Sequence, residues 1–87
     1  MMERDERPRM SSLYRMQFEA TQDHWVLLYP EGMVRLNLPA AEILQRCDGQ
    51  RTVDEIVAEL EAAFEQASLH EDVIGFLCQA RERGWLQ

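Results

Sequence analysis

The sequence predicts an α+β domain in which an N-terminal three-stranded antiparallel sheet is followed by three helices. Two observations favour this class. Residues 13–20 alternate between apolar and polar with the period of two that is typical of strands, and two further strand-like apolar runs flank a Pro-Glu-Gly turn at positions 30–32. After position 38 apolar residues recur three and four residues apart, as in helices with one buried side. Strands grouped before helices indicate a small sheet with the helices packed on one face.

Length and composition indicate one small globular domain with an acidic surface. The 87 residues, 46% of them hydrophobic and 29% charged, are sufficient for a single core. The chain has no apolar run of the ~20 residues that a membrane span needs, and its charged start is not a signal peptide, so we expect a cytoplasmic protein. The formal charge of −7 disfavours nucleic acid and suits either solubility or a basic protein partner.

The first third of the chain predicts an arm and a three-stranded meander. Residues 1–12 are polar and have no period, so we expect a flexible arm before a single domain formed by residues 13–87. Residues 13–20 alternate between apolar and polar and predict the first strand. Residues 24–30 and 33–37 predict two more strands, joined by a turn that contains Pro30 and Gly32.

The second strand is apolar on both faces. We expect Val26 and Leu28 to face the core, together with Val34 and Leu36 of the third strand. The opposite face would then carry three large apolar side chains: Trp25, Leu27 and Tyr29.

Two helices follow with clear signals. Residues 39–47 have Pro39 in the first turn and an apolar stripe, and Gly49 marks the stop. Thr52 and Glu55 have the spacing of a capping box, in which each side chain binds the other residue's backbone amide. The stripe of this second helix runs from Val53 to Phe64.

The third helix has the same start signal and an additional ridge. Ser68 and Glu71 repeat the capping-box spacing, and Gly84 marks the end, after which Trp85 and Leu86 can fold back onto the core. A mid-helix Gly75 either serves a crowded helix crossing or lets another backbone come close. The core stripe includes Val73 and Leu77, and a neighbouring ridge consists of Ile74, Cys78 and Arg81. The resulting architecture is similar to a winged helix-turn-helix with the sheet placed first.

No catalytic or metal site is indicated. His24 and His70 lie at element ends without ligand spacing, and the four glycines are too scattered for a phosphate loop. Cys47 and Cys78 occupy apolar positions and are expected to be buried free thiols, with a redox or metal pair as the alternative. We therefore expect no cofactor and no enzymatic activity.

The third strand offers a binding surface instead. At the edge of a simple meander, it presents unpaired backbone groups to which an extended peptide can add a strand, while side chains of the peptide lie on the ridge of the third helix. The alternatives are that the N-terminal arm covers this edge, or that the domain binds nucleic acid as winged helices do.

Three stretches of the chain together resemble one family. "VLLYPEGMVRLN", "AAEILQRCDGQRTVDEIVAEL" and "DVIGFL" with the terminal "GWL" are similar to the pyrroloquinoline quinone (PQQ) biosynthesis protein D family, PqqD. The similarity extends from about Leu13 to Leu86. Pro39 stands where many members have a Ser that can cap the helix, so we expect the first helix to start differently here.

The resemblance implies a non-catalytic peptide chaperone, which is a stand-alone recognition element for a ribosomally made precursor peptide. The family binds its precursor by strand addition and presents it to a radical S-adenosylmethionine enzyme. Carried onto this chain, the peptide-binding residues are Met33, Val34, Arg35, Leu36 and Asn37 of the third strand, and Val73, Ile74, Leu77, Cys78 and Arg81 of the third helix.

The resemblance does not account for the outer patch of Trp25, Leu27 and Tyr29. A patch of three large apolar residues is unusual on a small monomer, so we expect it to be a second interface. Its occupant would be another copy in a homodimer, the N-terminal arm or the modifying enzyme.

Overall fold

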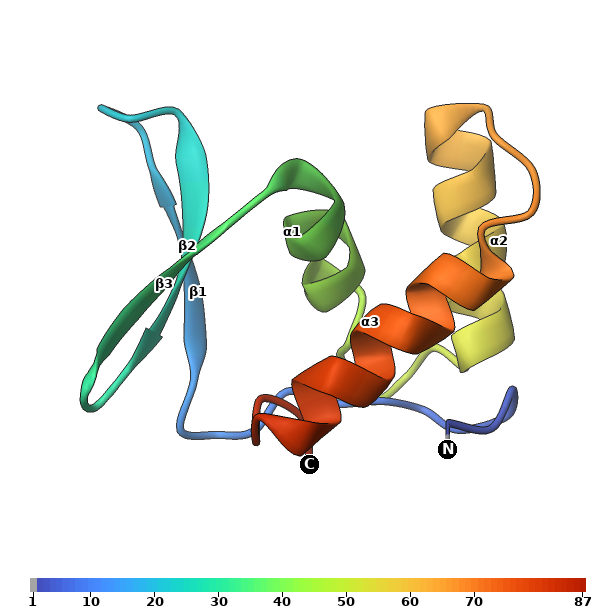
Figure 1. The fold of residues 1–87 in the computed structure, drawn as a ribbon, viewed down its shortest axis with the longest axis horizontal. Coiled ribbons are helices and arrows are strands. Elements are labelled where there is room, and N and C mark those ends of the chain that lie inside the picture. Colours follow the sequence, from blue (N-terminus) through green and yellow to red (C-terminus); the bar gives the residue numbers. More distant parts are fainter. Residues whose placement is uncertain (1) are drawn as a thin grey trace.

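The elements follow one another in the predicted order. The computed structural model describes residues 2–87. Its six elements are β1 (Arg15–Glu19), β2 (His24–Tyr29), β3 (Gly32–Leu36), α1 (Leu38–Gln45), α2 (Val53–Phe64) and α3 (His70–Glu82). The sheet has the order β1-β2-β3, and both pairs of strands are antiparallel. In Figure 1 the sheet lies at one end, α1 lies between it and α2, and α3 crosses in front of the other helices.

Strand β2 packs on the helices with the face opposite to the predicted one, whereas β3 packs with the predicted face. Leu27 pairs with Val34, whereas Val26 pairs with Arg35. Because paired residues share a face, Leu27 and Val34 lie together on the core side, and Leu27 has no exposed surface. Val26 is also buried, but it lies on the other face and outside the core cluster. Val34 and Leu36 of β3 therefore lie on the core side as predicted, whereas the prediction for Val26 and Leu28 of β2 was wrong.

This reversal removes the predicted second interface of Trp25, Leu27 and Tyr29. Leu27 belongs to the core, Trp25 is half-buried against it, and the Tyr29 ring lies 5.4 Å from the ring of Tyr14. The homodimer hypothesis that was based on this patch loses its support. A single exposed large apolar side chain, Met33, remains on the outer face of the β2–β3 pair.

The start of each helix has a different cap. The Asn37 side chain accepts a bond from the amide of Ala40 (2.9 Å) and caps α1, with Pro39 in the first turn. The capping box of α2 is confirmed, because Thr52 Oγ1 accepts from the Glu55 amide (3.1 Å) and Glu55 Oε1 accepts from the Thr52 amide (2.7 Å).

The second capping box, Ser68 with Glu71, was wrong. Helix α3 begins at His70, and Leu69 occupies the cap position without a side-chain cap. Ser68 has a φ of 63°, so the chain turns sharply there instead of starting the helix. The Leu69 amide donates to Glu61 Oε2 of α2 (3.0 Å), so the residue before α3 is held by a contact with the preceding helix.

The far end of α3 follows the prediction, but its glycine does not. Trp85 and Leu86 fold back and are buried in the core cluster. Gly75 is exposed, and a Cβ added there would meet nothing within 4 Å. Gly75 therefore does not serve a helix crossing within the chain.

Residues 2–12 are not the flexible arm that the sequence predicted. Met2 is buried in the core cluster at 4% exposure, and Pro8 is buried as well. The segment forms isolated bridges from Arg9 to Asp48 and from Met10 to Leu86. In Figure 1 it runs along the side of the helices, away from the free edge of the sheet. It therefore covers neither β3 nor the outer face of the sheet.

Candidate peptide-binding surface

Strand β3 is an edge strand. It pairs with β2 on one side, and within residues 2–87 no other strand pairs with its second side. Met33 is 58% exposed and Arg35 is exposed, whereas Val34 is half-buried and Leu36 is in the core. The side chain of Asn37, the last predicted contact on this strand, is engaged in capping α1. Val34 and Leu36 thus hold the strand on the core, while Met33 and Arg35 leave its outer side accessible.

The predicted residues of α3 fall into two groups. Val73 and Leu77 are fully buried in the core and support the helix from within. Ile74 and Cys78 are half-buried at its side, and Arg81 lies on the same side, because residues three, four and seven apart share a helix face.

Arg81 is engaged by the N-terminal segment. Its Nη2 donates to Glu6 Oε1 (2.6 Å) and lies 3.1 Å from the sulfur of Met2. A bond from the Glu3 amide and the pairing with Arg81 hold the pKa of the Glu6 carboxyl below its ordinary value. A peptide at this end of the ridge would have to share Arg81 with Glu6, a competition that sequence reasoning missed.

The other side of α3 faces α1 across an apolar hollow of about 460 Å³. It is lined by Asp72 and Val73 of α3, Pro39 and Ile43 of α1, and residues of α2 and the following loop. Phe64, predicted as core, is 36% exposed and forms part of this wall. The apolar stripe of α2 did not by itself indicate this hollow, because Phe64 continues the same spacing as the buried residues of the helix.

The "DGQRT" block is structural. Asp48 accepts bonds from the amides of Gln50 (2.9 Å) and Arg51 (3.3 Å), and these bonds lower the pKa of its carboxyl. Gly49 has a φ of +79°, and a Cβ there would lie 3.2 Å from the side chain of Arg9. The block therefore shapes the α1–α2 loop around the N-terminal segment.

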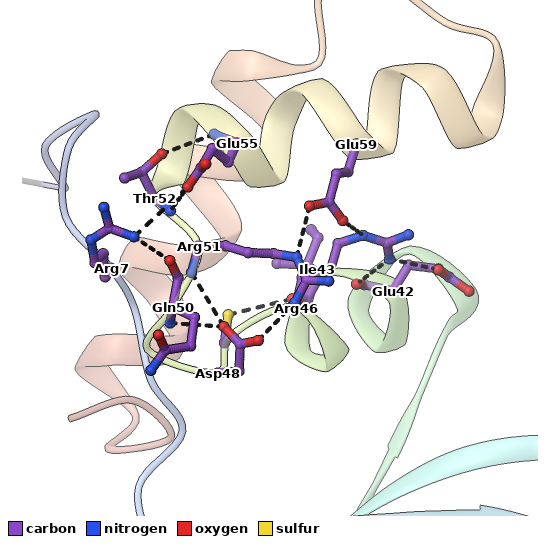
Figure 2. Close-up of polar contacts among 11 residues, drawn as sticks. Arg7, Glu42, Ile43, Arg46, Asp48, Gln50, Arg51, Thr52, Glu55 and Glu59 are labelled. Atoms are coloured by element: carbon purple, nitrogen blue, oxygen red, sulfur yellow. Dashed lines mark hydrogen bonds and ion pairs between the residues drawn. The ribbon is translucent and has the colours of Figure 1, made fainter.

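A carboxylate of α2 fixes the same loop from the other side. Figure 2 shows Glu59 between two guanidinium groups, Arg46 at 3.1 Å and Arg51 at 2.7 Å. Arg46 also pairs with Glu42 at 2.8 Å, one turn back in α1. These partly exposed pairs connect α1 to α2. They orient the two helices but add little to the free energy of unfolding.

The two cysteines do not form a redox or metal pair. Both are free, and residues 2–87 contain no cluster of three or more metal-ligating side chains. Burial raises the pKa of the Cys47 thiol to about 12, and the thiol donates to the carbonyl of Ile43 at 3.4 Å. Cys47 is therefore a protonated, packed thiol, as the sequence predicted, whereas Cys78 is only half-buried.

We expect a thiol-alkylating reagent at mildly alkaline pH to label Cys78 of the folded protein and to leave Cys47 unmodified. Only the thiolate reacts, and at such a pH a thiol with a pKa of about 12 is almost entirely protonated. Mass spectrometry of the labelled peptides measures both sites. In denaturant the two thiols should react equally, and equal labelling in the native state would contradict the assignment.

The α3 helix is poorly suited to a nucleic-acid backbone. Its first turn contains Glu71 and Asp72, and the basic residue in its last turn, Arg81, is paired with Glu6. Phosphate groups would be repelled at this helix N-terminus. No helix within residues 2–87 combines the length and the apolar character that crossing a bilayer requires.

Comparisons with known proteins agree with this architecture. Curated relatives named "PqqA binding protein" include those of Rahnella aquatilis, 50% identical over 84% of this chain and 78% of the relative, and of Kluyvera intermedia, 51% identical over 85% and 82%. The solution structure of the PqqD truncation of Methylobacterium extorquens PqqCD superposes with a TM-score of 0.82 at 25% identity, covering 100% of this chain and 95% of that one.

That solved structure is described as a functional and stand-alone recognition element for ribosomally synthesised and post-translationally modified peptides. Residues 24–86 match the family described as coenzyme PQQ synthesis protein D. The matched range begins with β2 and ends at Leu86, which folds back onto the core, so it contains the edge strand and all three helices. The chain belongs to the coenzyme PQQ synthesis protein D (PqqD) family.

Proposed function

We propose that this chain is a peptide chaperone of PQQ biosynthesis, which binds the ribosomally made precursor peptide and presents it to a radical S-adenosylmethionine enzyme. The observation that carries the proposal is the open edge of β3 in a family whose relatives are named for binding PqqA. The chaperone holds the substrate and leaves the chemistry to the enzyme. It works in the cytoplasm, where its ribosomal substrate is made.

The register of the β2–β3 hairpin indicates which backbone groups receive the peptide. The two-residue loop is closed by the pair Tyr29 and Gly32. In such a hairpin the closing pair exchanges hydrogen bonds, and bonded pairs then alternate with non-bonded ones. Val34 and Leu36 consequently bond to β2, while the backbone groups of Met33 and Arg35 point to the free edge. A peptide strand adds at these two residues.

A proline at Met33 tests strand addition. Met33→Pro removes an outward donor, which edge strands tolerate, and we expect it to weaken binding of the precursor peptide about tenfold with little loss of stability. The matched control is Met33→Ala, which removes the side chain and keeps the amide. Isothermal titration gives the affinities and urea unfolding gives the stabilities. If both variants bind like the unmodified chain, β3 is not the edge that pairs.

Amide chemical shifts locate the rest of the surface. On addition of precursor peptide, we expect shifts for residues 33–37 of β3 and 73–81 of α3. Shifts confined to β1 and the outer face of the sheet would contradict peptide binding along β3 and α3.

A further inference from the structure

The negative charge of the protein is concentrated in one part of the chain. Of the 16 acidic residues, seven lie between positions 52 and 80, where there is no Arg or Lys. The other nine are balanced by the nine arginines. The net charge of −7 therefore belongs to α2, the loop after it and most of α3. In Figure 1, α2 and this loop lie at the end of the molecule farthest from the sheet, and α3 runs from there back across the middle.

Most of this charge is not neutralised within the fold. Glu59 is paired with Arg46 and Arg51, and Glu55 lies 3.9 Å from Arg7. Among the ion pairs formed within residues 2–87, none includes the remaining five: Asp54, Glu61, Glu65, Glu71 and Asp72. A surface with unpaired carboxylates attracts a cationic partner and repels anionic ones.

The apolar hollow lies within this acidic region. Six of its lining residues are apolar, and the two polar ones are Gln66 and Asp72. The α2–α3 loop holds one wall in place, because the Glu61 carboxylate accepts the amide of Leu69, a lining residue. Glu65 follows Phe64 directly in the sequence, and Glu71 precedes Asp72. An apolar hollow with carboxylates beside it fits a large apolar side chain flanked by Arg or Lys.

We propose that this hollow and its carboxylates are the docking surface for a basic protein segment carrying such a side chain. A second copy of the chain is disfavoured as the occupant, because it carries the same negative charge of −7. None of the lining residues belongs to β3, and the one lining residue in the predicted peptide-binding set, Val73, is buried in the core, so a peptide on the edge strand and the outer ridge of α3 leaves the hollow free. Resting on the proposed function, the inference assigns this surface to the peptide-modifying enzyme, which can then bind together with the peptide.

Two matched pairs of variants test the assignment. Glu65→Lys and Glu82→Lys change the net charge equally, and both positions are exposed, but only Glu65 lies beside the hollow. Phe64→Ala and Phe18→Ala remove equivalent exposed rings, 36% and 45% exposed, from the hollow and from the sheet. The probes are the purified radical S-adenosylmethionine enzyme of the pathway and the precursor peptide, each titrated separately and then together.

We expect Glu65→Lys and Phe64→Ala to raise the Kd of the enzyme about tenfold, and the two controls to leave it within about twofold. Added salt should weaken enzyme binding to the unmodified chain. Equal effects in the control variants, or no binding of the enzyme to the unmodified chain, would overturn the assignment. So would weaker precursor binding by Phe64→Ala without enzyme, which would place the peptide in the hollow.

The two proposals fail in different ways. If the enzyme binds through the hollow but the precursor peptide does not bind the chain, the chaperone function is wrong and the docking surface stands. If the precursor binds at β3 but enzyme affinity is the same in all four variants, the chaperone function stands and the docking surface is wrong.

Discussion

Replacing Leu27 by Ala is expected to lower the free energy of unfolding by about 3 kcal/mol, because it leaves a cavity in the core. Leu27 has no exposed surface and lies in the cluster where the sheet meets the helices. Helix α1 is the helix that contacts β2 most, so the loss would loosen the attachment of the whole sheet. Urea unfolding followed by far-UV circular dichroism measures the change.

The matched control is Leu28→Ala, which removes the same atoms from the next residue. Leu28 is half-buried on the outer face, so we expect a cost of only about 1 kcal/mol. The face assignment made from the apolar pattern alone would give the reverse order, with Leu28 the costlier position. A larger loss for Leu28→Ala than for Leu27→Ala would therefore contradict the register of the sheet.

The sequence predicted the elements of the sheet correctly but assigned the wrong core face to β2, and the reason is physical. Residues 25–29 are apolar at every position, so alternation gave no direction. The turn did contain the answer. A loop of two residues, Pro30 and Glu31, pairs Tyr29 with Gly32, and even-numbered residues of β2 then face odd-numbered residues of β3. Leu27 must therefore share a face with Val34 and not with Arg35.

The capping-box spacing predicted the start of α2 correctly and the start of α3 wrongly. Helix α3 follows a loop that contacts the preceding helix, and the spacing of residues along the chain does not report such a contact. Thr52 and Glu55 satisfy each other within one turn, as the spacing predicted. Ser68 and Glu71 have the same spacing, yet Ser68 adopts a φ of 63° and Glu61 of the preceding helix accepts the amide of the next residue, Leu69. That contact depends on how α2 and α3 cross, which spacing along the chain cannot specify.

The candidate site was predictable in part for a similar reason. The open edge of β3 follows from strand order, which a meander fixes. The partners of α3 do not follow from its periodicity. Its spacing grouped Arg81 with Ile74 and Cys78, but only the fold shows that Glu6 reaches Arg81, while Asp72 lines a hollow with Pro39 on the other side.

The N-terminal segment was predicted to be a flexible arm, and the prediction failed because the role of the segment depends on backbone groups that composition does not reveal. An α-helix leaves its first amides without partners inside the helix. In α2, the side chains of the capping box serve Thr52 and Glu55. The amides of Val53 and Asp54 donate to the carbonyls of Glu6 (2.9 Å) and Arg4 (3.1 Å). The segment thus completes the cap of the helix that anchors the core.

Removing residues 2–7 is accordingly expected to lower the free energy of unfolding by about 3 kcal/mol. Burial of the Met2 side chain accounts for about 2 kcal/mol, and the two lost cap bonds account for much of the rest, since water replaces them in part. Hydrogen exchange should show faster exchange at the amides of Val53 and Asp54, while Glu55, held by Thr52, changes only with global stability.

A point variant separates the segment's contacts from its mere presence. Asp5 is exposed, and Asp5→Ala should leave stability within about 0.5 kcal/mol of the unmodified chain, as for most surface positions. Met2→Ala should cost about 2 kcal/mol, close to the transfer of its side chain out of the core.

A shortened chain that unfolds at the same urea concentration as the full chain would show that the segment lies on the domain without stabilising it. The segment also holds Arg81 through Glu6, so its removal frees the Arg81 side chain to contact a peptide on the ridge of α3. A less stable domain that nonetheless bound the precursor more tightly would show that the segment and the peptide compete for α3.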